Sequence, residues 1–98
     1  MLTSRQRSYL MSLANTLEPI VSVGKMGATE QVSKALAKAL ADHELVKVRF
    51  QDFKDEKNDL AYALAMTSKA ELVRLVGNVA VFYKESPIPE KQTIELPA

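Results

Sequence analysis

The chain has 98 residues, of which 47% are hydrophobic and 26% are charged, and it contains no cysteine. This composition is typical of one compact domain, and without cysteine the chain cannot form disulfides, cysteine-based zinc sites or a thiol nucleophile. The first residues are charged, and no stretch is long and apolar enough for a signal peptide or a membrane span. We therefore expect a cytoplasmic protein that does not bind membranes.

The formal net charge of +1 hides an asymmetry. Residues 1–84 carry 12 Lys and Arg against 9 Asp and Glu, a charge of +3, whereas residues 85–98 carry one lysine against three glutamates, a charge of −2. A mildly basic body of this kind suits a polyanionic partner.

The first predicted helix spans about Ser4 to Leu17. Thr3 and Gln6 have the spacing of a capping box, apolar residues then recur at helical spacing, and Pro19 ends the helix. Residues 20–23 form a short apolar strand.

A turn with two glycines three positions apart follows this strand, in the order Gly24-Lys25-Met26-Gly27. Thr29 is a good N-cap for a second helix that runs to about Asp42. His43 comes at the end of this helix, where its side chain can cap the last carbonyl groups.

The second half of the chain predicts a strand, a helix and a hairpin. Residues 45–51 alternate, with Val46, Val48 and Phe50 on one face. The acidic segment 52–59 suits a helix start. The buried stripe expected for this third helix consists of Leu60, Ala63, Leu64 and Thr67. Two strands, Glu71–Val76 and Val79–Lys84, then flank the hairpin signal Gly77-Asn78.

This order predicts an α/β fold of the α+β two-layer type, α-β-α-β-α-β-β. Strand-helix-strand units favour parallel neighbours, and the final hairpin adds an antiparallel last strand, so we expect a mixed four-stranded sheet. One domain would cover residues 1–84. The acidic segment 85–98, which contains prolines, would be an irregular tail or would dock on the domain through Ile94 and Leu96. The tyrosines and phenylalanines fall at core-like positions, without the paired exposed aromatics of a base-stacking platform.

The glycine turn is the strongest candidate for a binding site. Glycines let a backbone approach a ligand closely, and the first turn of the next helix presents unpaired amides and the positive end of its dipole to an anion. Lys25 adds a mobile charge. The RNA-binding residues predicted at this turn are Gly24, Lys25, Met26, Gly27, Ala28 and Thr29. A plain strand-to-helix turn is the alternative interpretation.

Other cations could extend this site. Lys34 and Lys38 lie on one side of the second helix, and they form either a basic track for RNA or an ordinary solvated face. Arg5 and Arg7 lie at the start of the first helix, where its dipole disfavours positive charge, so RNA contact and a surface role stay open. Lys47 and Arg49 either belong to this basic patch or shield the exposed face of the sheet. Arg74 is expected on a strand surface, with RNA contact as the alternative.

The sequence resembles the bacterial YhbY proteins, which are free-standing versions of the CRM (chloroplast RNA splicing and ribosome maturation) RNA-binding domain. The resemblance covers residues 2–84 and rests on four groups of residues. These are Leu2-Thr3 with Gln6-Arg7 and Leu10; Val21, Val23, Gly24, Lys25 and Gly27; His43-Glu44-Leu45-Val46-Lys47-Val48; and Glu71-Leu72-Val73, Val76-Gly77, Val79-Ala80-Val81 and Tyr83.

The resemblance implies a fold similar to the C-terminal domain of translation initiation factor three. It also implies RNA binding and association with immature large ribosomal subunits. Two positions depart from the family pattern, since Met26 stands where such loops usually have Asn and Asn78 stands where Arg is frequent.

We therefore expect a non-enzymatic, monomeric protein that grips ribosomal RNA phosphates through the turn and helps to assemble the large ribosomal subunit. Contacts to phosphates do not read sequence, so structured or double-stranded RNA is the expected ligand. The sequence offers no catalytic constellation, metal-ligand set or phosphate-binding loop of nucleotide hydrolases, so no cofactor and no small-molecule substrate is expected. The alternative is a protein-interaction or translation-regulatory module that binds a ribosomal protein or factor.

Overall fold

The computed structural model describes residues 1–98 and contains the helices and strands expected from the sequence, in the same order. They are α1 (Ser4–Ala14), β1 (Val21–Val23), α2 (Glu30–His43), β2 (Leu45–Phe50), α3 (Lys57–Ser68), β3 (Glu71–Val76) and β4 (Val79–Tyr83), with 3-10 helices at Lys54–Glu56 and Pro89–Lys91. None of the helices combines the length and the apolar character needed to span a bilayer.

The four strands form one mixed sheet in the order β1-β2-β4-β3. β1 pairs with β2 in parallel, and β4 runs antiparallel to both β2 and β3. This confirms the predicted fold with its antiparallel last strand. β3 is not a direct neighbour of β2, because the tight turn at Gly77 and Asn78 returns β4 into the position between them. β2 and β4 are therefore the two inner strands, and β1 and β3 are the edges of the sheet.

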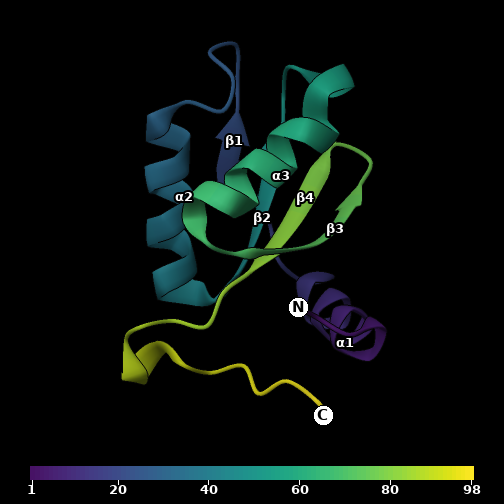
Figure 1. The fold of residues 1–98 in the computed structure, drawn as a ribbon, viewed down its shortest axis with the longest axis vertical. Coiled ribbons are helices and arrows are strands. Elements are labelled where there is room, and N and C mark those ends of the chain that lie inside the picture. The colour runs from purple at the N-terminus through teal and green to yellow at the C-terminus, as the bar shows by residue number, and fades with distance from the viewer.

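Helices cover both faces of the sheet (Figure 1). α2 and α3 pack on one face around a core that includes Leu36, Leu64 and Phe82. α1 packs on the opposite face, where Leu10 and Ala14 form one apolar cluster with sheet residues that include Val81. α1 thus adds a partial third layer to the expected two.

Helix α1 is shorter than predicted. It begins with the expected capping box of Thr3 and Gln6 but ends at Ala14, with Asn15 as its C-cap. Leu17 continues the apolar spacing but lies outside the helix with 38% of its surface exposed. After Asn15 the regular α-helical bonding stops, because the amide of Leu17 donates to the carbonyl of Ala14, three positions back. Pro19 restricts only Glu18 and does not account for the earlier end.

The buried side of α3 also differs from the prediction. Its buried residues are Ala61, Leu64, Ala65 and Ser68, whereas Ala63 and Thr67 are exposed. Three of these four buried side chains, those of Ala61, Ala65 and Ser68, are small. A pattern of large apolar residues does not reveal such a face.

The prediction that all aromatic residues are core-like is wrong for three of them. Tyr9 and Phe53 are partly exposed, and Tyr62 has 63% of its surface exposed on α3. Likewise, His43 makes no hydrogen bond to the end of α2. Glu44 ends that helix instead, with φ +64°, and its amide donates to the carbonyl of Leu40.

Glu44 also holds the segment 85–98 against the domain. Its side chain is fully buried, and its carboxylate accepts hydrogen bonds from the amides of Ser86 at 2.9 Å, Thr93 at 2.8 Å and Ile94 at 3.0 Å. Ile94 and Leu96 pack beside α1. Burial alone raises the pKa of the Glu44 carboxyl, but the three backbone amides outweigh it and the pKa lies below its ordinary value.

Candidate nucleic-acid interface

The loop between β1 and α2 is a tight turn closed by its two glycines. The amide of Gly27 donates to the carbonyl of Gly24 at 3.0 Å, which leaves Lys25 and Met26 at the tip. The Met26 side chain is 85% exposed. Gly27 has φ +79°, a conformation that side chains disfavour, and it lies beside the ring of Phe53.

Thr29 starts α2 as predicted. Its hydroxyl accepts a hydrogen bond from the amide of Val32 at 3.3 Å, and its own amide donates to the carbonyl of Gly27. The amides of Lys25, Met26 and Ala28 donate to no other backbone group. These amides, together with the positive end of the α2 dipole, can therefore receive an anion.

Gly24 stands apart from Gly27 because the fold does not require a glycine there. Its φ is negative, and a Cβ built on it would meet nothing within 4 Å. The missing side chain leaves open space against the turn. A ligand can use this space to approach the backbone.

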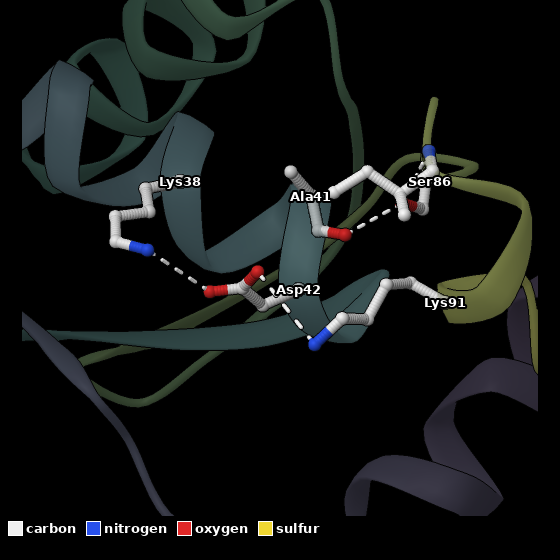
Figure 2. Close-up of polar contacts among 6 residues, drawn as sticks. Lys38, Ala41, Asp42, Ser86 and Lys91 are labelled. Carbon is white, nitrogen blue, oxygen red and sulfur yellow. Dashed lines mark hydrogen bonds and ion pairs between the residues drawn. The ribbon is translucent and has the colours of Figure 1, made fainter.

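The two lysines predicted on α2 face solvent and are each paired with an acid on the same helix. Lys34 lies 3.3 Å from Glu30, and Lys38 lies 3.3 Å from Asp42. Figure 2 shows Asp42 between Lys38 and Lys91, a lysine of the tail whose Nζ lies 4.0 Å from the carboxylate. Exposed ion pairs of this type are weak, so each lysine can readily bind another anion in place of its carboxylate partner.

The two arginines of α1 are not brought together with the loop. Figure 1 shows α1 and the β1–α2 loop at opposite ends of the long axis of the molecule. Arg5 is exposed, whereas Arg7 is partly buried and its Nη1 donates to the carbonyls of Leu72 at 2.6 Å and Val73 at 2.7 Å. Arg7 thus joins α1 to β3, where the pairing with β4 shifts register.

One feature of the surface was not predicted from the sequence. A shallow groove of about 370 Å³ runs from the loop along the outer edge of β1 and is walled on its other side by α2. Its lining residues outside the loop include Ile20, Ser22, Gln31, Val32 and Ala35. They come from two separate segments, and no periodic pattern in either one marks a shared surface.

Comparison with known proteins identifies the chain with one family. Residues 2–84 match the CRS1/YhbY (CRM) domain. The chain is 45% identical over 98 residues to the Bacillus subtilis protein named "Probable RNA-binding protein YqeI", covering 99% of this chain and 100% of that protein. A Haemophilus influenzae protein named "RNA-binding protein" is 35% identical over 97 residues, covering 98% and 95% of the two chains. The solution structure of the hypothetical protein SAV1595 from Staphylococcus aureus superposes with a TM-score of 0.81 at 40% identity, covering 99% of this chain and 100% of that one.

Proposed function

Because this chain belongs to the CRS1/YhbY (CRM) domain family, we propose that it is a non-enzymatic RNA-binding protein that holds RNA phosphates at the loop of residues 24–29. Relatives of nearly the same length carry names that describe RNA binding. The match covers the whole folded body of the chain, so the proposal does not depend on a short motif.

The state of Gly24 is the observation that carries the placement at the loop. The fold does not need a glycine at this position, because its φ is not positive and an added Cβ would meet no other atom within 4 Å. Gly24 nevertheless stands next to amides that have no backbone partner. A phosphate could therefore accept from the amides of Lys25 and Met26. The Lys25 ammonium could pair with a neighbouring phosphate, and Ala28 and Thr29 fix the start of α2 beside it.

The rest of the interface would extend from this loop along α2. Lys34 and Lys38 could exchange their acidic partners for phosphates. Arg5 could reach only a long or folded RNA, because α1, to which it belongs, lies at the other end of the molecule (Figure 1). We leave Arg7 out of the interface because its guanidinium already bonds to backbone carbonyls.

The proposed biological target is ribosomal RNA of the immature large subunit, bound by a monomer in the cytoplasm. The similarity to the YhbY proteins supports this part of the proposal. In it, the protein aids assembly by holding the RNA in position and does not break bonds. Crosslinking in cells followed by sequencing of the bound RNA tests it. Recovery of messenger or transfer RNA without precursor ribosomal RNA would contradict it.

A pair of charge-matched variants tests the loop. Lys25→Gln should weaken binding to all RNAs alike and lower the slope of log affinity against log salt by about one. Arg74→Gln removes the same charge from β3, at the opposite edge of the sheet from β1, and should leave the slope unchanged. Gly24→Val should strongly weaken RNA binding while the circular dichroism spectrum stays that of the wild type. Equal effects of Lys25→Gln and Arg74→Gln on the salt slope would refute phosphate binding at this loop. Wild-type RNA affinity of Gly24→Val would refute it as well.

A protein-interaction or translation-regulatory module is the second candidate function. It is favoured by a pocket of about 430 Å³ where the chain between α1 and β1 meets β2 and the tail, lined by Leu13, Leu17, Leu45 and Ile94. RNA binding that is absent, or that does not change with salt, would favour this candidate.

A further inference from the structure

The groove beside β1 differs chemically from the loop that it adjoins. Its walls include the apolar side chains of Ile20, Met26, Val32 and Ala35. Ile20 is 58% exposed. An RNA duplex presents phosphates and riboses to a protein and keeps its bases stacked inside. A bound duplex would therefore cover these apolar side chains with charged phosphates. An apolar groove beside a phosphate site is instead suited to bases that have left the stack.

The same groove offers polar groups that base edges could use. β1 is an edge strand, since it pairs only with β2, so the backbone groups on its outer edge have no strand partner, and residues 20–22 line the groove. Ser22 and Gln31 line the groove and are exposed, and their side chains make no hydrogen bond within the protein. Hydroxyl, amide and backbone groups of this kind can pair with donors and acceptors on an unpaired base.

Charge along α2 fits a single strand that enters from the loop. Gln31, Ala35 and Lys38 recur at spacings of four and three, which places Lys38 on the same side of the helix, one turn beyond the groove. Lys91 of the tail lies on the other side of Asp42 (Figure 2). Because two lysines share one aspartate, these three side chains carry a net charge of +1 at the far end of the groove.

We propose that the groove between β1 and the first half of α2 binds unstacked bases of single-stranded RNA, with the adjoining phosphates held at the loop of residues 24–29 and by Lys38. This inference rests on the proposed function and names its ligand class. It replaces the expectation of a structured or double-stranded ligand, because an apolar groove made by two separate segments can take bases without a platform of paired aromatics.

Two substitutions on α2 test the groove. Ala35→Gln fills it without changing charge and with little change in helix propensity, and Ala37→Gln makes the same change at an exposed position of α2 that does not line the groove. The probes are a 12-nucleotide single-stranded RNA of mixed sequence and a perfect RNA duplex of the same length, titrated at one salt concentration.

The wild type should bind the single strand about tenfold more tightly than the duplex, since burying one Ile-sized side chain changes an equilibrium by about that factor or more. Ala35→Gln should remove most of this preference, Ile20→Ser should reduce it, and Ala37→Gln should retain it. Equal wild-type affinity for both probes, or an unchanged preference in Ala35→Gln, would overturn the groove inference. The proposed function would then still stand if Gly24→Val lowers binding to both probes, whereas a wild type that binds neither RNA contradicts the proposed function as well.

Discussion

Glu44 should be the most sensitive single residue for stability outside the apolar core. Its carboxylate is fully buried and is held by three backbone amides of the segment 85–98, so Glu44→Gln changes the charge while keeping the shape. Glu85→Gln is the matched control, because Glu85 is exposed and makes no hydrogen bond through its side chain.

The size of the effect follows from the hydrogen bonds. One carboxylate oxygen serves Thr93 and Ile94, and the other serves Ser86. A glutamine can keep one oxygen in place, but its NH₂ group must then face an amide that also donates. Loss of one charge-assisted bond and burial of an unpaired donor predict a loss of about 2–3 kcal/mol in the free energy of unfolding. Glu44→Ala loses all three hydrogen bonds and should lower the free energy of unfolding by about 3–5 kcal/mol. The upper value applies when the tail is released from the domain.

Urea unfolding followed by circular dichroism measures these values, and amide hydrogen exchange at Ser86, Thr93 and Ile94 reports on the tail. Exchange should accelerate at these three amides in Glu44→Gln and stay slow in Glu85→Gln. A loss below about 0.5 kcal/mol, with slow exchange retained at the three amides, would refute the reasoning, since surface changes are usually of that size.

The same carboxylate makes stability depend on pH. Because the pKa of Glu44 is lower in the folded state than its ordinary value of 4.5, its contribution to stability is present above that value and is lost as the pH falls through the folded pKa. Wild-type stability should therefore decline more steeply below pH 4.5 than that of Glu44→Gln. Parallel declines would show that Glu44 does not link the tail to pH.

Two further substitutions separate structural from functional roles. Gly27→Ala should lower the free energy of unfolding by about 1–2 kcal/mol, because φ +79° is strained for a residue with a side chain, although Phe53 at 3.6 Å leaves an ordinary contact distance. Gly24→Ala should change it by less than about 0.5 kcal/mol. Equal unfolding midpoints of the two variants in urea would contradict this difference. Arg7→Met keeps the apolar stem but leaves two carbonyls without their donor, and should cost about 1–3 kcal/mol with little change in RNA affinity. A stable Arg7→Met protein that no longer binds RNA would instead place Arg7 in the interface.

The candidate site was predictable where it is local in sequence. The glycine turn, the Thr29 cap and the start of α2 follow from residue types whose conformational preferences act over a few positions. The role of Arg7 was not predictable, because its partners are carbonyls more than sixty positions away at a register shift in β3. The ion pairs of Lys34 with Glu30 and of Lys38 with Asp42 are also local, since the partners lie four positions apart on one helix.

By itself the sequence determined the order of helices and strands, the hairpin at Gly77, the glycine turn at residues 24–27 and the family, since each depends on local preferences or on a linear match. Only the tertiary structure decided that α1 covers the opposite face, that Gly24 is free of structural demands, and that Ile20 meets Ala35 across a groove. It also decided that the Glu44 carboxylate is buried and holds the tail. These features arise where segments distant in sequence come together, and burial then changes what a charged or apolar side chain does.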